Sequence, residues 1–210
     1  LPCTGGQIIQ NRLDEYGVPY EFLETDGKAR VNIKIFDDSK KTVTEINEKG
    51  SRVSEKKLQL IANKVKLTAK NKDKVFLTGS LPDECDPSFY ADLIAALSRK
   101  GVRCILDAAG TPLRLGIKAG PYFIKPNKDE ICALFELSDP GLEEIARAAK
   151  KLAEEGIPYV MVSLGEEGAL LADRAEVLYA EPLKTEVKST VGAGDSMIAA
   201  AACQLDKDMG

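Results

Sequence analysis

Residues 192–195, Gly-Ala-Gly-Asp, place three small residues and one carboxylate directly before an apolar stretch that predicts a helix. At such a helix start the N–H groups of Gly192, Ala193 and Gly194 are not covered by large side chains, so they can bind an anion such as phosphate. A bound anion repels a carboxylate, so Asp195 makes chemical sense there if it removes a proton beside the anion. We interpret the turn as a candidate anion hole with its general base.

Two other interpretations of this turn stay open at this point. An Asp near a helix N-terminus usually caps the helix, and taken alone a cap is the commoner role. A dinucleotide-binding loop needs a third Gly three residues after the second, where this chain has Met197. A P-loop needs Gly-Lys followed by Ser or Thr, which occurs nowhere in the chain. Both standard phosphate loops therefore fit poorly.

The composition argues against several kinds of partner. The chain has 210 residues, enough for one main core, and its hydrophobic share of 44% and charged share of 30% are typical of a soluble globular protein. The formal net charge is −4 without a large basic cluster, so we expect no nucleic-acid partner. No apolar run approaches the roughly 20 residues that span a bilayer, so we expect no membrane partner either.

The absence of histidine narrows the possible chemistry. Without His, the chain cannot use Ser-His-Asp or Cys-His catalysis or a His-ligated metal site. Its 5 cysteines are scattered without a Cys-x-x-Cys pair, and no signal peptide is visible, which together predict a reducing, cytoplasmic location. Catalysis must then depend on carboxylates, Lys, Arg, backbone N–H groups or a hard cation held by oxygen atoms.

Short apolar segments alternate with amphipathic ones over most of the chain. This alternation predicts an α/β fold with a mainly parallel sheet and helices on both faces. The expected strands are 75–77, 102–106, 122–124 and 159–162, with an antiparallel edge at 169–172 and 176–180, and the expected helices are 6–16, 54–69, 87–101, 111–118, one that begins at 127, and 140–156.

A small ribbon is predicted near the N-terminus. Val31, Ile33 and Ile35 alternate with polar residues, which is typical of a half-buried strand, and residues 42–46 return as a second alternating strand. In the main sheet, ligands should bind beyond the carboxyl ends of the strands. The polar segments that follow strands, and that we expect at this rim with the turn 192–195, are 78–80, 107–108, 125–127 and 163–165.

Five blocks of the sequence resemble one family, in that family's order. The segment Val-Lys-Ser-Thr-Val-Gly-Ala-Gly-Asp-Ser-Met at 187–197 is similar to the C-terminal signature of the phosphofructokinase-B sugar kinases, which have the ribokinase-like fold. The other blocks are Ala29–Lys34, Thr78–Pro82, Lys125–Glu130 and Val162–Ala169. Within the family, the strand Arg-Val-Asn-Ile-Lys and the segment 44–47 most resemble 1-phosphofructokinases and tagatose-6-phosphate kinases.

The resemblance implies a doubly wound sheet with an incomplete lid. Residues 1–28 and 49–210 would form a partial kinase core, and residues 29–48 the lid strands. Relative to the family, the first strands and a sugar-binding Gly-Gly-Lys-Gly-x-Asn block are missing, and the family continues beyond Gly210. We therefore expect a chain truncated at both ends.

The implied reaction is the ATP-dependent phosphorylation of a ketohexose phosphate, namely fructose 1-phosphate to fructose 1,6-bisphosphate. Tagatose-6-phosphate kinase and 6-phosphofructokinase are alternatives within the class, and an inactive nucleotide-binding fragment is an alternative of another class. The implied partners are the sugar phosphate, ATP and Mg²⁺, with a homodimer formed through the lid.

The resemblance also assigns roles to individual residues. Asp195 matches the catalytic base, and Gly192, Ala193 and Gly194 match the anion hole. Residues implied at the ATP site are Lys125, Asn127, Ser163, Gly165, Gly168, Val187 and Lys188; those implied at the sugar phosphate are Arg30, Asn32 and Ser80; and those implied at Mg²⁺, partly through water, are Asn127 and Glu130.

Several of these residues also have a simpler interpretation. Asn127 followed by Glu130 is typical of a capping box, Lys125 of a solvated surface lysine, and Arg30 of an exposed charge on a ribbon. The segment 163–168 could be an ordinary turn.

Overall fold

The computed structural model describes residues 2–4, 6–28, 30–37, 39, 42–48, 50–182 and 192–205. The chain divides into two compact units, which we name the ribbon unit (residues 1–69 and 80–89) and the sheet unit (residues 70–79 and 90–210). Each unit is described by itself. Every helix in the described residues falls short of the length and apolarity needed to cross a bilayer.

The sheet unit is built on six strands in the order β10-β9-β8-β7-β6-β5. The neighbouring pairs from β5 to β8 are parallel, and β8-β9 and β9-β10 are antiparallel, so the predicted antiparallel edge is confirmed. The strands are β5 (Lys74–Thr78), β6 (Arg103–Asp107), β7 (Phe123–Ile124), β8 (Tyr159–Ser163), β9 (Ala169–Ala172) and β10 (Val177–Ala180).

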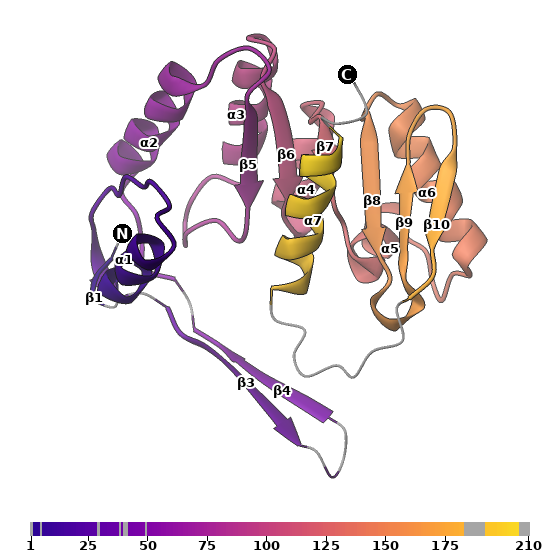
Figure 1. Cartoon of the computed structure of the whole chain (residues 1–210), viewed down its shortest axis with the longest axis horizontal. Coiled ribbons are helices and arrows are strands. Elements are labelled where there is room, and N and C mark those ends of the chain that lie inside the picture. The colour runs from indigo at the N-terminus through magenta and orange to yellow at the C-terminus, as the bar shows by residue number, and fades with distance from the viewer. Residues whose placement is uncertain are drawn as a thin grey trace. The chain divides into compact units, whose positions relative to one another are not determined.

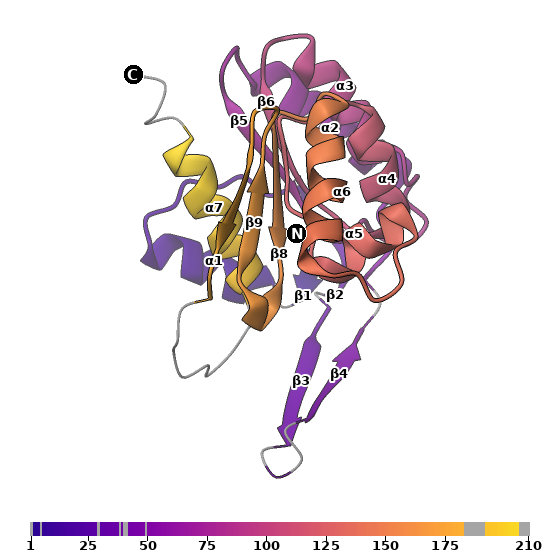
Figure 2. The same cartoon turned by 90° about the vertical axis from the view of Figure 1, so that its right-hand side faces the viewer.

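Helices cover both faces of this sheet, as predicted. Figures 1 and 2 show α3, α4, α5 and α6 on one face and α7 on the other. The first face carries α3 (Phe89–Ser98), α4 (Gly110–Lys118), α5 (Lys128–Phe135) and α6 (Leu142–Glu154), and the second carries α7 (Ala193–Gln204).

The core of the sheet unit explains why the sequences of its central strands are continuously apolar. Cys104, Ile105 and Leu106 of β6 are all fully buried, because both faces of this strand are covered. On one face, Ile105 packs in a cluster with Ile198 and Ala202 of α7. On the other, α4 approaches so closely that a Cβ at Gly116 would lie 2.4 Å from Leu106.

The described residues of the ribbon unit form two short two-stranded sheets and the helices α1 and α2. The strands β1 (Pro2–Thr4) and β2 (Thr25–Lys28) pair in parallel, and α1 (Gly6–Glu15) lies between them in the sequence. The predicted ribbon is confirmed as β3 (Asn32–Asp37) paired antiparallel with β4 (Thr42–Asn47). The helix α2 (Glu55–Thr68) starts after Ser54, whose side chain accepts a hydrogen bond from Lys57 N.

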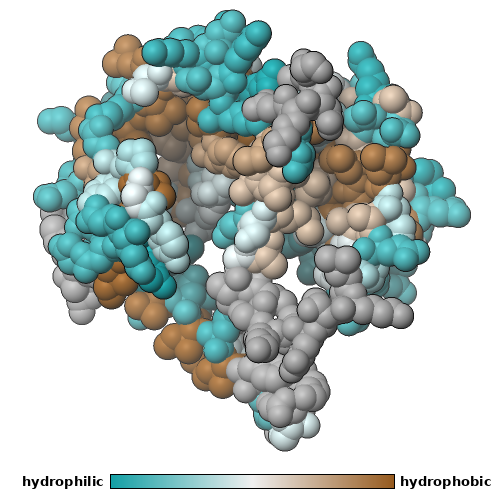
Figure 3. Space-filling model, viewed as in Figure 1, coloured by the Kyte–Doolittle hydropathy of each residue, from teal (hydrophilic) through white to brown (hydrophobic). Residues whose placement is uncertain are grey.

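One face of the ribbon is apolar and exposed. Ile33 lies opposite Ile46, Ile35 follows Ile33 at the next alternate position of β3, and Val31 directly precedes the strand. These side chains are about half exposed, and the apolar surface along the ribbon is visible in Figure 3. The prediction that residues 29–48 act as a lid separate from the core stays a prediction.

Candidate active site

The predicted anion-binding turn is the start of α7. Gly192 is its N-cap residue, in a left-handed conformation with φ of 77° that only glycine adopts without strain. The Ser196 N–H donates to the Gly192 carbonyl at 2.9 Å, which closes the first turn. Because the first N–H groups of a helix have no partner within it, those of Gly192, Ala193 and Gly194 can bind an anion.

Asp195 lies in this first turn but is not the cap. It is the third residue of α7, and the N-cap position belongs to Gly192. Its side chain is on an exposed residue at the positive end of the helix, where a carboxylate is stabilised. The position of Asp195 is therefore compatible with a base that faces solvent and substrate.

Lys125 is buried, contrary to the solvated-surface interpretation. It follows β7 directly and is only 6% exposed. Its ammonium lies 3.4 Å from the carboxylate of Asp107, the last residue of β6. A Cβ placed on Gly194 would lie 3.2 Å from Lys125 Nζ. The lysine thus lies between the rim of the sheet and the first turn of α7.

Three carboxylates, those of Asp107, Asp195 and Glu130, take part with Lys125 in the electrostatics of this rim. Burial raises the pKa of Asp107, Lys125 opposes that rise, and the charge of Asp195 adds to it. Burial likewise raises the pKa of Glu130, the backbone N–H of Asn127 lowers it, and the charge of Asp107 raises it. Neighbouring carboxylate charges therefore add to the rise in the pKa of Asp107 and of Glu130, and Lys125 opposes the rise at both.

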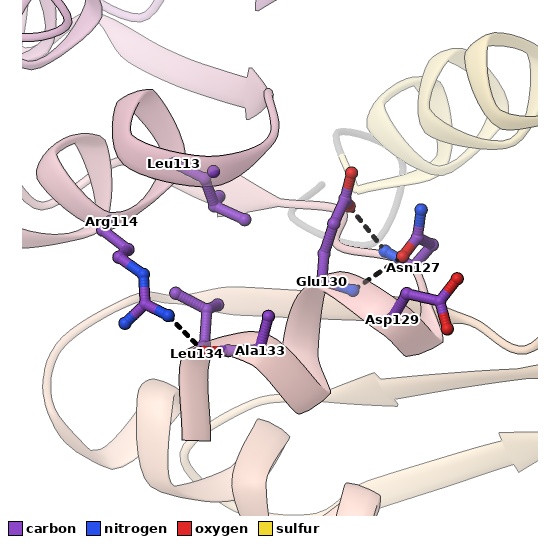
Figure 4. Close-up of a pocket in the computed structure, with 8 residues that line it drawn as sticks. Leu113, Arg114, Asn127, Asp129, Glu130, Ala133 and Leu134 are labelled. Carbon is purple, nitrogen blue, oxygen red and sulfur yellow. Dashed lines mark hydrogen bonds between the residues drawn. The ribbon is translucent and has the colours of Figure 1, made fainter. Parts of the chain in front are cut away.

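Asn127 and Glu130 form the capping box of α5. Asn127 Oδ1 accepts from Glu130 N at 2.8 Å, and a carboxylate oxygen of Glu130 accepts from Asn127 N at 2.8 Å. The other carboxylate oxygen points away from Asn127 (Figure 4). The cap therefore uses half of the Glu130 carboxylate and leaves one oxygen directed elsewhere.

A pocket of about 210 Å³ lies beside this cap, between α4 and α5. In Figure 4 Arg114 lies at the far end of the pocket from Glu130, where its guanidinium donates to the carbonyl of Ala133. The residues that line the pocket are Gly110, Leu113, Arg114, Asn127, Asp129, Glu130, Ala133 and Leu134.

The residues at this rim fit Mg²⁺ only together with a substrate. Within the described residues, no group of three or more Asp, Glu or Cys side chains is arranged to hold a metal by itself. Mg²⁺ is commonly held by one or two carboxylates, waters and substrate phosphates, and dehydrates reluctantly. The second oxygen of Glu130 and the surrounding negative charge fit that mode of binding.

The predicted nucleotide loop is a tight turn after β8. The N–H of Ser163 donates to the Pro126 carbonyl, which ties the loop to the segment before α5. Residues Gly165–Glu167 form a 3₁₀ turn. Gly168 packs so closely against the backbone that a Cβ placed on it would lie 2.2 Å from the Ala180 carbonyl oxygen.

Side-chain contacts hold this turn from two further directions. The Lys128 ammonium lies 2.8 Å from the carboxylate of Glu167, and the Tyr179 hydroxyl donates to the Glu167 carbonyl at 2.9 Å. Val187 and Lys188, also predicted at the ATP site, lie outside the described residues.

Two of the residues predicted at the sugar phosphate contact each other in the ribbon unit. The Arg30 guanidinium donates to the Ser80 hydroxyl at 2.7 Å, although the two residues are far apart in the sequence. Asn32 lies two residues further along, where it pairs with Asn47 across the ribbon. Arg30, Asn32 and Ser80 are all exposed.

Asp107 was missing from the predicted site residues. The available signal was its position, because it is a carboxylate at the carboxyl end of a predicted strand, where ligands bind. The segment 107–108 was predicted to lie at this rim, but no role was assigned to Asp107 until the structure showed its buried contact with Lys125.

Comparison with known families identifies the family of this chain. The family described as pfkB family carbohydrate kinase matches residues 4–210. The chain belongs to this family.

Individual relatives show which members of the pfkB family this chain is similar to. A 1-phosphofructokinase of Haemophilus influenzae is 38% identical over 91% of this chain, and one of Rhodobacter capsulatus is 39% identical over 82%. This pfkB-family chain spans 61% and 55% of the lengths of those two relatives.

The fold is that of solved phosphofructokinases. The structure of Escherichia coli phosphofructokinase-2 in complex with substrates and products matches 99% of this chain and 68% of its own, with a TM-score of 0.90 and 27% identity. The predicted fold class is therefore confirmed.

Proposed function

We propose that the protein carrying this chain transfers the terminal phosphoryl group of ATP to a ketohexose phosphate, converting fructose 1-phosphate to fructose 1,6-bisphosphate. The observation that carries the proposal is the first turn of α7, where Asp195 follows three small residues with Lys125 beside them. Membership of a carbohydrate kinase family and relatives named 1-phosphofructokinase support the choice of reaction and substrate.

In this reaction Asp195 is the general base. It accepts the proton of the attacking sugar hydroxyl, the hydroxyl oxygen forms a bond to the terminal phosphorus of ATP, and the bond from that phosphorus to the bridging oxygen breaks. ADP leaves with the electron pair of the broken bond. A positioned base of this kind accelerates a reaction by roughly 10²–10⁴-fold.

The start of α7 and Lys125 stabilise the charge on the phosphoryl group. The N–H groups at residues 192–194 bind its oxygens, as preorganised donors do in an anion hole. Lys125 adds a positive charge next to Gly194, where its burial strengthens the interaction. Asn127 and Glu130 would hold Mg²⁺, partly through water, and the metal would neutralise charge on the ATP phosphates.

The remaining residues bind the two substrates. Arg30 binds the phosphate that the sugar already carries, because a planar guanidinium makes two parallel hydrogen bonds to phosphate oxygens. Ser80 orients Arg30 through their hydrogen bond and, with Asn32, contacts the sugar. The nucleotide is bound by the turn with Ser163, Gly165 and Gly168, and by Val187 and Lys188.

The reaction is tested by ADP release from the full-length protein with three substrates in parallel. Fructose 1-phosphate should give the highest kcat/KM, above fructose 6-phosphate and tagatose 6-phosphate. A preference for either of the others would assign the protein to the corresponding kinase. ATP binding without turnover on any of the three would support an inactive nucleotide-binding protein.

We further propose that the ribbon is a lid that forms a homodimer interface. Its exposed isoleucines on one face support this, since a two-stranded ribbon is marginally stable alone. Sedimentation of the full-length protein at micromolar concentration should give a dimer, and a monomer would contradict the proposal.

A further inference from the structure

Lys125 is unusual because an ammonium group is rarely buried. The residue is only 6% exposed, and lysines at such depth are normally paired with an opposite charge. The Asp107 carboxylate, at 3.4 Å, supplies that charge and is itself mostly buried, with 19% of its side chain exposed.

The backbone fixes this pair through two neighbouring parallel strands. Leu106 of β6 is in register with Ile124 of β7, and Lys125 N donates to the Leu106 carbonyl at 3.3 Å. Asp107 directly follows Leu106, and Lys125 directly follows Ile124. They therefore leave the sheet side by side, at the edge where the carboxyl ends meet.

The distance between the two charges leaves the ammonium able to bind something else. Direct ammonium–carboxylate hydrogen bonds are usually about 2.7–2.9 Å long, so a contact of 3.4 Å is loose. Lys has three N–H donors, and one carboxylate contact does not use them all. The ammonium also reaches the first turn of α7, where it lies against Gly194.

We propose that Asp107 is a positioning residue that holds the Lys125 ammonium against the start of α7, so that the ammonium meets the phosphoryl group bound there. This rests on the proposed function, and it goes further by giving the carboxyl end of β6 a role in the reaction. Asp107 acts through Lys125 and does not touch the substrate. Gly194 is required by the same arrangement, because a side chain there would occupy the place of the ammonium.

A double-mutant cycle in the full-length protein tests this coupling. The Asp107→Asn variant should lower kcat by about 10–100-fold, because small displacements of a catalytic group have effects of that size. Its KM for the sugar phosphate should stay within about twofold. The Lys125→Met variant should lower kcat by about 10²–10³-fold, as removal of one anion-hole donor does.

The decisive result is the double variant. If Asp107 acts through Lys125, adding Asp107→Asn to Lys125→Met has no further effect on kcat. A fall by the product of the two single effects, or a wild-type kcat for Asp107→Asn, would overturn the proposal. The matched control is Asp173→Asn, which changes a half-buried carboxylate in the turn after β9 and should leave kcat within twofold.

Further measurements distinguish a failure of the coupling from misfolding of a variant and from a failure of the proposed function. Thermal unfolding of each variant shows whether it folds, and if Asp107→Asn does not, Asp107→Glu takes its place, since it keeps the charge but moves the carboxylate. That variant should also lose kcat without a change in the KM of the sugar phosphate. If the wild type shows no turnover at all, the proposed function fails, and the same cycle is measured on the dissociation constant of ATP. Additive effects on that constant would overturn the coupling by themselves.

Discussion

The two ends of the proposed reaction are built differently. In the sheet unit, beside the exposed Asp195, the pair Lys125 and Asp107 is largely buried at the rim of the sheet, and the pKa of Asp107 is raised by burial. In the ribbon unit Arg30 and Ser80 are exposed, and their hydrogen bond lies on the surface. Lys125 and Asp107 are therefore held in place by a packed core, whereas Arg30 and Ser80 lie on an exposed surface.

This difference in burial corresponds to two functions, namely stabilisation of the transition state and binding of the substrate. Preorganised charges in a site that excludes water stabilise a transition state strongly, because they do not reorganise during the reaction. An exposed arginine interacts more weakly through water and can move, which suits binding and release of a charged substrate. We therefore expect changes in the sheet unit to affect kcat, and changes at Arg30 to affect KM.

The largest effect is expected for Asp195→Asn, which keeps the shape of the side chain but removes the base. We predict a loss of kcat of about 10²–10⁴-fold with little change in ATP affinity, measured by steady-state kinetics and calorimetry. The control is Asp92→Asn, which removes an acidic residue from the first turn of α3. Equal small losses in both variants would mean that Asp195 only stabilises its helix.

The next effect is on the binding of the sugar phosphate. Arg30→Ala should raise the KM for the sugar phosphate by about 10–100-fold, the range of a hydrogen bond to a charged group, and should leave the ATP KM unchanged. Arg12→Ala, which removes another exposed arginine of the ribbon unit, serves as the control. An unchanged KM for Arg30→Ala would return this residue to the role of a surface charge.

A stability prediction concerns the nucleotide turn. Gly168→Ala should lower the free energy of unfolding by about 3 kcal/mol, because φ is 94° and the new Cβ would meet the Ala180 carbonyl. Gly165→Ala also has a positive φ but open space around it, and should cost about 1 kcal/mol. Urea unfolding measures both, and equal losses would show that the carbonyl contact does not matter.

The smallest effect is a pH dependence of stability. The pKa of Asp107 is raised in the folded state, mainly by burial, so the folded state holds this proton more tightly than the unfolded state. The folded state is therefore destabilised as pH rises from the ordinary Asp pKa of 3.8 through the raised value. Asp107→Asn removes this loss, so the unfolding free energy of the wild type minus that of the variant should decrease over this range.

Asp173 supplies a comparison of opposite sign. Its pKa is lowered, first by the N–H of Glu176 and then by that of Ala175, so its contribution is present above the ordinary Asp pKa and is lost as pH falls. For Asp173→Asn, the same difference in unfolding free energy should increase with pH. Slopes of the same sign for both variants, in urea titrations at several pH values, would contradict these assignments.

The sequence predicted the elements that depend on local signals. The helix expected at 54–69 is α2, because Ser54 caps it and its apolar residues are spaced for a helix. The helix expected from Pro140 instead begins at Leu142, since Asp139 takes a positive φ and Gly141 becomes the N-cap. Local capping and turn residues thus located the helices, with errors of up to three residues at their ends.

Features that depend on distant contacts were not predictable in the same way. The pairing of β1 with β2 was missed, because it joins segments on either side of α1. The burial of Lys125 was missed because lysine is usually exposed, and only the pairing of β6 with β7 brings Asp107 beside it. The turn at Gly192 was predicted because its small residues and its carboxylate are consecutive in the chain.

The most direct test of the account is the product of the reaction. The full-length protein is incubated with fructose 1-phosphate, ATP and Mg²⁺, and the phosphorus NMR spectrum is followed with time. We predict that a second sugar phosphate signal, on the C6 oxygen, grows in step with the loss of ATP, and that Asp195→Asn abolishes this growth. Loss of ATP without a new sugar phosphate, or an unchanged rate in Asp195→Asn, would contradict it.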